Sequence, residues 1–344
     1  MKVMHFHFGK YGGAERFFVH LVNALGRRGV EQRSVIRPGR TWRKDIEAAT
    51  RIHESHFRDA SLDRLLLPWR IQREARAWRP DAMISWMPRA ARVLPREPLA
   101  LRLARLGDYP TELRRVKNVD ALVCNTPGIA EHVRKMGWNR GVEVISNFTN
   151  MQRVAPVDRE ALGAPPGRRL VCTMGRLVPR KGIDVVIQAV AALEDTHLWI
   201  IGDGPEAANL RALAKELGVA DRIQFLGWQS DPRAHLAAAD VFAMASSHEP
   251  LGNIVLEAWA QRVPVVATRC EGPSWYMRDG ENGLLVDIGD QQGLAAAIER
   301  ISQYGELARA LVTGGCDTLH RQFSEEAVTG AYLRLFDGCV AKAA

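Results

Sequence analysis

Two glutamates on either side of a glycine turn are the residues of this sequence best placed for chemistry. Glu249 precedes the turn formed by Leu251, Gly252 and Asn253, and Glu257 follows eight positions after Glu249 on a predicted helix. A helix that begins at this turn leaves N–H groups of Gly252 and Asn253 without partners, and such groups favour an anion such as a diphosphate. A carboxylate two turns along can accept hydrogen bonds from two sugar hydroxyls.

A second charged set lies on the loop between a predicted strand, Leu170–Met174, and a predicted helix, Ile183–Leu193. Gly175 lets the backbone turn where the strand ends. Arg176 and Lys181 are then placed at the carboxyl end of a parallel strand, where α/β proteins bind ligands, and both cations can contact a phosphate. From these residues alone, a solvated basic loop is an equally good interpretation.

Apolar runs alternate with amphipathic stretches along the whole chain, which is typical of βαβ units and parallel sheets. The strands predicted in the first half are 3–8, 33–37, 82–86, 99–106, 121–125 and 142–146. The clearest predicted helix is Ala14–Arg28, whose apolar residues recur at helical spacing and which Gly29 can end. The second half repeats the alternation from the strand at 170–174 through a strand at 197–201 to about residue 302.

The sequence therefore predicts an α/β protein with two doubly wound domains. The first domain spans residues 1–150, and a linker with three prolines and no periodicity follows over 151–168. The second domain spans 169–322, and the final segment, 323–344, is predicted to be a helix that can return to the first domain. Two domains agree with the length, because 344 residues exceed what one hydrophobic core usually organises.

The composition is that of a soluble globular protein, with 47% hydrophobic and 25% charged residues. Five scattered cysteines, none in a C-x-x-C or Cys/His ligand spacing, predict reduced thiols in the cytoplasm. No signal peptide is expected, because the first residues contain no apolar run of sufficient length, and no uncharged apolar run reaches the roughly 18 residues that a membrane span needs.

The charge is divided unequally between the halves. Residues 1–150 hold 28 Lys and Arg against 15 Asp and Glu, a balance of +13, whereas the remainder holds 19 against 24, a balance of −5. A strongly basic half predicts a polyanionic partner, which could be a nucleic acid, an anionic membrane surface or a phosphorylated substrate.

The segment 62–79 combines leucines and Trp69 with five arginines, and it predicts a reversible contact with an anionic membrane at the cytoplasmic face. An interpretation of equal weight packs Ile71, Ala75 and Trp78 on the sheet and leaves the arginines solvated. Pro68 is expected to limit the length of any continuous helix here.

Taken together, the motifs resemble the retaining GT-B glycosyltransferases of family 4. The resemblance covers nearly the whole chain, through GGAE at 12–15, GRLVPRKG at 175–182, IGDGP at 201–205, EPLGNIVLEA at 249–258, VPVVAT at 263–268 and NGLLV at 282–286. The stretches RLGDYP at 105–110, NTPGI at 125–129 and ISNF at 145–148 are most similar to bacterial enzymes that build lipopolysaccharide cores and similar surface glycans.

The resemblance implies two Rossmann-like domains that face a cleft, and a hexosyltransferase that moves sugar from a UDP-hexose or GDP-mannose to a glycan or glycolipid with retention. It implies that Arg176 and Lys181 hold the donor diphosphate, Glu257 the ribose and Glu249 the transferring sugar. The turn that begins at Leu251 would complete the phosphate site. The loop at Gly12 and Gly13 would approach from the other domain, as the short backbone of glycine allows. Neither a metal nor another cofactor is implied, and no Asp-x-Asp loop suited to Mg²⁺ occurs.

The sequence departs from the family at one position. Many relatives present a histidine near the reacting carbon, at the end of the strand matched to 99–106, where this chain has Asp108. Asp108 can replace that histidine by accepting a hydrogen bond from the sugar or the acceptor, or it can cap a helix before Pro110. His5 and His7, on a predicted buried strand, are interpreted as structural. His248, beside Glu249, is placed near the site.

The sequence supports three alternative functions less well than a glycosyltransferase. Residues 202–207 match G-x-G-x-x-A, a variant of the dinucleotide fingerprint, but no acidic residue follows the next predicted strand, 222–226, to hold a ribose. A nucleic-acid partner is not predicted, because the basic residues are scattered without an RNA or DNA motif. A non-catalytic nucleotide-sugar binder would be expected to have lost Glu249 or Lys181, and both are present.

Overall fold

The computed structural model describes residues 1–10, 12–57, 61–95 and 100–340. The contacts divide the chain into two compact units. Unit 1 holds Met1–Phe148 together with the C-terminal helix α11 (Glu325–Val340), and unit 2 holds Thr149–Ser324. The chain therefore passes from one unit to the other twice. The helix predicted over 323–344 is observed over Glu325–Val340 and lies with the N-terminal unit, while Phe323 belongs to unit 2 and positions 341–344 lie outside the described residues.

Unit 1 is built on a seven-stranded sheet of order β3-β2-β1-β4-β5-β6-β7, in which all paired strands are parallel. The strands are β1 (Lys2–His7), β2 (Glu31–Ile36), β3 (Arg51–Glu54), β4 (Ala82–Ser85), β5 (Leu101–Leu106), β6 (Ala121–Cys124) and β7 (Gly141–Val144). Helices α1 (Gly13–Arg27) and α11 pack on one face, and α2 (Asp63–Trp78) and α3 (Pro127–Lys135) pack on the other. Successive strand residues point to opposite faces, so each face has its own apolar core.

Unit 2 repeats this plan with six strands in the order β10-β9-β8-β11-β12-β13. The strands are β8 (Arg169–Met174), β9 (Thr196–Ile201), β10 (Ile223–Gly227), β11 (Val241–Met244), β12 (Val265–Thr268) and β13 (Leu284–Val286). One face is covered by α4 (Ile183–Ala191), α5 (Ala207–Glu216) and α9 (Gln291–Gln303), and the other by α6 (Arg233–Ala237), α7 (Asn253–Ala260), α8 (Glu271–Tyr276) and α10 (Gly305–Phe323). The strand order reverses between β8 and β11, which is where open α/β sheets bind ligands.

The prediction of two doubly wound parallel sheets is confirmed. The predicted strands lie within about two residues of the observed ones, although position 99 of the predicted strand 99–106 lies outside the described residues. Gly29, with φ 77°, ends α1 as predicted. Strand β3 was not predicted, because it is a short and largely exposed edge strand that carries little apolar signal.

Packing contacts determine where α2 and the predicted linker lie. Pro68 does not interrupt α2, which continues from Asp63 to Trp78, so the predicted limit on its length is wrong. The proline is the sixth residue of the helix and removes one backbone hydrogen bond, while the buried side chains of Ile71 and Ala75 hold the helix on the sheet. The predicted linker, 151–168, lies with unit 2, where Val157 N donates to Ala234 O at 3.1 Å.

Candidate functional site

The loops that follow β8 and β11 lie side by side at the point where the strand order of unit 2 reverses. Ser247 N donates to Arg180 O at 2.9 Å, which joins the two loops through their backbones. Gly182 begins α4 with φ 61°, and a Cβ atom there would lie 2.1 Å from the carbonyl oxygen of Ala245. The loops therefore pack too closely for any larger residue at this position.

The side chains of Lys181 and Glu249 meet across these two loops. Lys181 Nζ and Glu249 Oε2 form an ion pair, and the side chains are only 13% and 16% exposed. The lysine stem passes Gly175, where a Cβ atom would lie 3.5 Å from Lys181 Cε. The two predicted charges are thus brought together in a partly desolvated place, where electrostatic interactions are stronger than in water.

Helix α7 begins beside this ion pair. Its N-cap residue, Gly252, has φ 84°, a left-handed conformation that favours glycine. Tyr276 Oη donates to Gly252 O at 3.4 Å, and burial raises the pKa of Tyr276 well above its usual value, which keeps the hydroxyl protonated. The side chain of Leu251 is buried in the core, so only its backbone can face a ligand. Asn253 begins the helix, and Glu257 is half-buried on its second turn.

Glu271, the first residue of α8, was missed by the sequence analysis. Its carboxylate accepts from Glu249 N at 3.2 Å and from His248 Nδ1 at 2.8 Å. Burial raises the pKa of Glu271, but the hydrogen bonds from its own backbone, from His248 and from Glu249 N outweigh burial and lower it. Glu271 therefore fixes the backbone of Glu249. An acidic residue three positions after the apolar run 263–268 was the available signal.

The remaining predicted residues are less enclosed. Arg176 is exposed on the loop after β8. Gly12, with φ 141°, and Gly13 stand at the start of α1 in unit 1. A Cβ atom added at Gly12 would lie 3.0 Å from the buried carboxylate of Glu15. Asp108 is exposed after β5 and accepts from Tyr109 N at 2.8 Å.

The alternative role of Asp108 as a helix cap is wrong. Residues 109–119 form turns and bends but no helix, so no helix N-terminus exists before which Asp108 could stand. Asp108 lies in a bend instead, and its carboxylate accepts from the backbone of the next residue. The proposed contact with sugar or acceptor is not affected by this correction.

His5 and His7 are buried on β1, as the sequence predicts. Burial lowers the pKa of His5 to about 4, while its hydrogen bond with Gln32 opposes this shift. Burial also lowers the pKa of His7 to about 3, with a further contribution from nearby arginines, foremost Arg40. Both imidazoles are therefore neutral at ordinary pH, which suits structural roles.

Arg105, next to the end of β5, is the residue of unit 1 that sequence reasoning missed. Its guanidinium is buried, lies over the ring of Phe17 at 4.7 Å and donates to Tyr332 Oη at 3.1 Å and to Asn147 Oδ1. Tyr332 lies on α11, far away in the sequence. Arg105 thus ties the C-terminal helix to the sheet of unit 1.

The glycine-rich stretch at 202–205 has a structural explanation. A Cβ atom at Gly202 would lie 1.9 Å from the carbonyl oxygen of Gly175, whose own N–H donates to Ile201 O at 2.9 Å. The loops after β8 and β9 can approach this closely only without a side chain at Gly202. The partial dinucleotide fingerprint therefore reflects packing between neighbouring strands.

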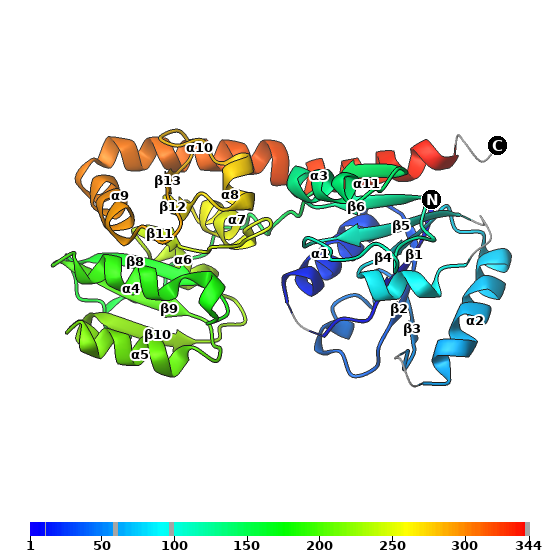
Figure 1. Ribbon diagram of the computed structural model, residues 1–344, viewed down its shortest axis with the longest axis horizontal. Coiled ribbons are helices and arrows are strands. Elements are labelled where there is room, and N and C mark those ends of the chain that lie inside the picture. Colours follow the sequence, from blue (N-terminus) through cyan, green and yellow to red (C-terminus); the bar gives the residue numbers. More distant parts are fainter. Residues whose placement is uncertain (11, 58–60, 96–99, 341–344) are drawn as a thin grey trace. The chain divides into compact units, whose positions relative to one another are not determined.

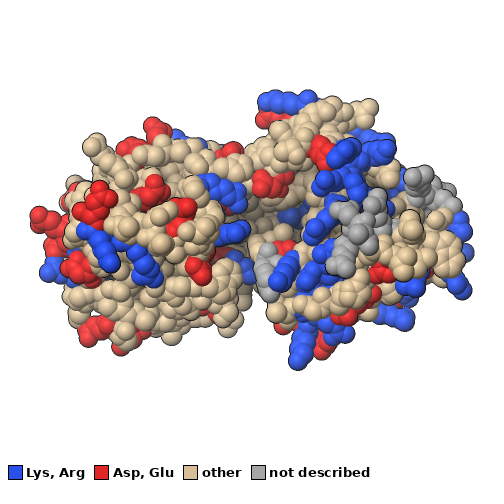
Figure 2. Space-filling model, turned by 60° about the horizontal axis from the view of Figure 1, so that its bottom comes forward, with Lys and Arg blue, Asp and Glu red and all other residues tan. Residues whose placement is uncertain are grey.

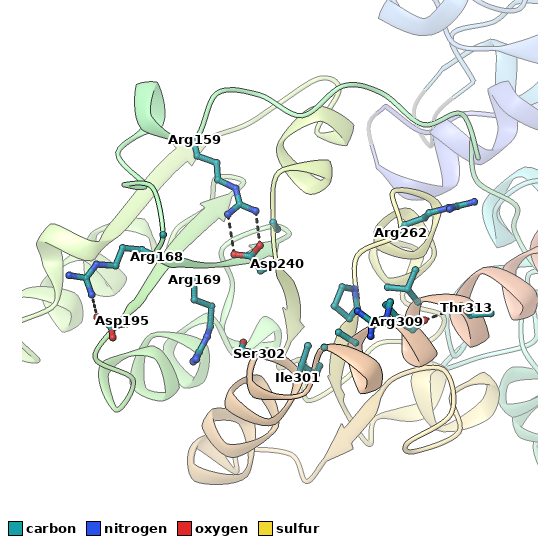
Figure 3. A pocket seen from close by; sticks show the side chains of 16 residues that line it. Arg159, Arg168, Arg169, Asp195, Asp240, Arg262, Ile301, Ser302, Arg309 and Thr313 are labelled. Carbon is teal, nitrogen blue, oxygen red and sulfur yellow. Dashed lines mark hydrogen bonds and ion pairs between the residues drawn. The ribbon is translucent and has the colours of Figure 1, made fainter.

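A pocket of about 1050 Å³ lies near the amino ends of β8 and β11, away from these loops. Figure 3 shows two ion pairs in it: Arg159 forms a two-bonded ion pair with Asp240, and Arg168 pairs with Asp195. The side chain of Arg262 extends away from the Arg159–Asp240 pair.

The parts of the chain that the structure describes contain no group of three or more His, Cys, Asp or Glu side chains arranged to hold a metal ion. Nor does any helix in those parts have the length and apolar character to span a membrane.

Comparison with known proteins shows consistent similarity along the chain. Residues 11–153 match the family described as Glycosyltransferase Family 4, and residues 154–315 match the family described as Glycosyl transferases group 1. The lipopolysaccharide core biosynthesis glycosyltransferase LpsE of Rhizobium meliloti is 58% identical over 97% of this chain and 98% of its own length. LpsD of the same organism is 52% identical over 99% of this chain and 100% of its own length.

Solved structures share the fold. The crystal structure of HepE from Anabaena in complex with UDP-glucose has a TM-score of 0.83 and 21% sequence identity, and the match covers 98% of this chain and 100% of that one. The lipopolysaccharide outer core galactosyltransferase WaaB has a TM-score of 0.77 and 18% identity, with full coverage of both chains.

Proposed function

The chain belongs to the glycosyltransferases of family 4, with a group 1 domain in its second half, and from this premise we propose that it adds a hexose to a lipopolysaccharide core or a similar surface glycan. The donor is a UDP-hexose or GDP-mannose, and the anomeric configuration is retained. The names of LpsE and LpsD, which resemble this chain over almost their whole length, support the acceptor class.

The ion pair between Lys181 and Glu249 carries the proposal for the donor site. It places a cation and a carboxylate beside the N-terminus of α7, at the strand reversal of unit 2. The lysine and the N-terminus of the helix suit a diphosphate, and the carboxylate suits the hydroxyls of the attached sugar. Glu257 on the same helix is assigned to the ribose.

In this proposal the developing charge on the leaving diphosphate is stabilised by protein cations in place of a metal. Lys181 acts from the loop before α4, and Arg176 acts from the exposed start of the same loop. Fixed positive groups of this kind stabilise a transition state without reorganising during the reaction. Because the leaving phosphate can take the acceptor proton in a front-face attack, no protein nucleophile is assigned.

Unit 1 is proposed to serve the acceptor at the cytoplasmic face of the membrane. Figure 2 shows Lys and Arg side chains gathered over this unit, in keeping with the balance of +13 over residues 1–150. A basic surface attracts both an anionic lipid surface and an anionic acceptor. Asp108 and the glycines at 12 and 13 are assigned to the sugar and the phosphates, respectively.

A ligand-retention and transfer assay tests the proposal. The protein is incubated separately with labelled UDP-hexoses, GDP-mannose and NAD, and then with a retained donor and a lipopolysaccharide-core acceptor, with and without EDTA. We expect one sugar nucleotide to be retained and transferred, with the anomeric configuration preserved by NMR and no effect of EDTA. Retention without transfer to any acceptor would favour a non-catalytic binder, and inversion or strict Mg²⁺ dependence would contradict the proposed chemistry.

A further inference from the structure

The outward face of α2 exposes a cluster of large apolar side chains. Four of them lie within eight consecutive positions: Leu62 is 78% exposed, Leu65 75%, Leu66 46% and Trp69 61%. We call these four residues the α2 apolar patch. Single exposed leucines are ordinary, but a contiguous group on adjacent helical turns usually marks an interaction surface.

The patch is not required to hold α2 in place. The helix is anchored by its opposite face, where Leu67, Ile71, Ala75 and Trp78 are each at most 8% exposed in the core of unit 1. These buried residues recur at helical spacing and account for the packing on the sheet. Packing in the core of unit 1 therefore accounts for one apolar face of α2, whereas the α2 apolar patch is exposed to solvent among the described residues of that unit.

The charges beside the patch are of one sign. Arg70, Arg73 and Arg76 are exposed along the next turns of α2, and Arg73 lies 5.9 Å from the ring of Trp69. The described residues that line a shallow hollow of about 540 Å³ on this side all belong to α2, namely Trp69, Gln72, Arg73, Arg76 and Ala77.

Both acidic residues of α2 are already engaged. Glu74 forms an ion pair with Arg33 at 2.6 Å. Asp63 accepts from Ser55 Oγ and from His56 N, each at 2.7 Å, and the Ser55 hydrogen bond in particular lowers its pKa. The outward face of α2 therefore presents apolar and cationic groups, with its carboxylates held by other elements.

We infer that α2 docks on an anionic lipid surface, with the α2 apolar patch entering the boundary between headgroups and acyl chains and the arginines contacting lipid phosphates. Leucine and tryptophan on one part of a surface helix and arginine beside them are the composition that lies in a membrane interface. The inference rests on the proposed function in one respect, that the acceptor is presented at a membrane. It goes further in stating that apolar side chains of α2 insert into the lipid surface, in addition to the attraction between charges.

Insertion and simple charge attraction differ in their response to salt. Attraction between a basic surface and anionic lipid is screened strongly at about 0.5 M salt, where the Debye length falls to a few ångströms. Burial of apolar side chains in the interface does not weaken with screening. We therefore expect binding to vesicles of phosphatidylcholine and phosphatidylglycerol to fall at high salt but to keep a salt-resistant part.

The test compares two exposed tryptophans in a vesicle co-sedimentation assay. The double variant Leu65→Ser/Trp69→Ser should lose about 100-fold in vesicle partitioning at low salt and most of the salt-resistant part, because two of the four apolar side chains of the patch are removed. Trp228, which is 69% exposed in unit 2, is the matched control, and Trp228→Ser should leave partitioning unchanged. Arg70→Gln/Arg73→Gln should weaken binding at low salt while the salt-resistant part remains.

Two further measurements separate this inference from the proposed function. Thermal unfolding and retention of the labelled donor should be the same in Leu65→Ser/Trp69→Ser and in the wild type, because the substituted side chains are exposed and belong to unit 1.

Unchanged lipid binding by this variant would overturn the inference even if transfer is observed. Self-association that the variant abolishes in sedimentation velocity, without lipid binding by the wild type, would assign the patch to a second copy of the chain and would also overturn it. Lipid binding as expected, with no transfer from any donor, would instead count against the proposed function alone.

Discussion

At the carboxyl ends of the strands, the loops of the two sheets are held in place by different kinds of contact. In unit 2 the edge is fixed by the backbone, because glycines such as Gly182 and Gly202 allow neighbouring loops to approach within contact distance of each other's carbonyl oxygens. In unit 1 the corresponding edge is organised by side chains, with neutral His7 and the buried cation Arg105 near the ends of β1 and β5. Backbone contacts demand particular residues in a fixed order, whereas side-chain contacts can be made from many sequences.

This difference agrees with the division of work that we propose. Every nucleoside-diphosphate sugar carries the same diphosphate group, so one fixed arrangement of loops and helix can bind it. An acceptor glycan differs between enzymes, and a side-chain surface can be altered residue by residue without disturbing a sheet. The following predictions test whether the reactive charges lie in unit 2 and whether unit 1 contributes stability, charge and orientation.

The largest effect is expected at Lys181. Replacement of Lys181 by Ala should reduce turnover about 100- to 1,000-fold, or by about 3 to 4 kcal/mol, because it removes a fixed charge directed at the leaving diphosphate. Initial rates of sugar transfer measure this, with circular dichroism as a check on folding. Arg180→Ala is the matched control, since Arg180 is an exposed cation one position away on the same loop. More than a tenth of the wild-type rate in Lys181→Ala would place the reactive cation elsewhere.

The two glutamates of unit 2 should differ in kind. Glu249→Ala should mainly lower kcat, because its carboxylate is placed to act on the sugar as charge develops, while Glu257→Ala should mainly raise the KM of the donor. A hydrogen bond to a charged group contributes about 1.5 to 3 kcal/mol, which sets the expected size of each change. Steady-state kinetics with varied donor measure both constants, with exposed Glu216→Ala as the control. Identical defects in the two variants would remove the proposed division of roles.

A third effect concerns the stability of unit 1. The folded-state pKa values of His5 and His7, about 4 and about 3, lie below the unfolded value of 6.5. The unfolded state therefore takes up more protons as the pH falls, so stability is complete above about pH 6.5 and declines toward the folded pKa values. Between pH 6.5 and about 5, each histidine should lower the free energy of unfolding by about 2 kcal/mol.

Thermal unfolding across this pH range measures the decline. The variant His7→Asn keeps an acceptor for Gly9 N, which donates to His7 Nδ1 at 3.1 Å, but does not titrate. Its Tm should fall less steeply with pH than that of the wild type. Parallel curves for the two proteins would show that the buried histidines do not govern the acid response.

The sequence predicted the parts of the molecule that depend on local chemistry. The end of α1 at Gly29 and the start of α7 at Gly252 follow from glycine at left-handed positions. The family, the two doubly wound sheets and the burial of His5 and His7 are confirmed. The roles assigned to individual residues of the donor site, and the absence of a metal, stay predictions.

The features that were missed depend on contacts between distant segments. Glu271 reaches the backbone of Glu249 only because β12 pairs with β11, and a sequence does not state which strands are neighbours. Arg105 meets Tyr332 from the last helix of the chain. The continuation of α2 through Pro68 likewise depends on burial of Ile71 and Ala75, and tertiary packing of this kind routinely overrides local propensity.

The smallest effect is expected at Asp108, the one proposed catalytic residue that lies in unit 1. Its carboxylate is exposed and accepts from Tyr109 N, so it is already oriented by the turn that follows β5. If it then accepts a hydrogen bond from the sugar or the acceptor, Asp108→Asn should keep most activity, because an amide oxygen can still accept. Asp108→Ala should lower kcat about 10-fold, in keeping with about 1.5 kcal/mol, the lower end of the range for a hydrogen bond to a charged group, because Asp108 is exposed, and it should leave the KM of the donor unchanged. Steady-state kinetics and Tm measured on both variants separate this role from that of a turn residue. If Asp108→Ala lowers the Tm but not kcat, then Asp108 only stabilises the turn. Every reactive side chain would in that case belong to unit 2.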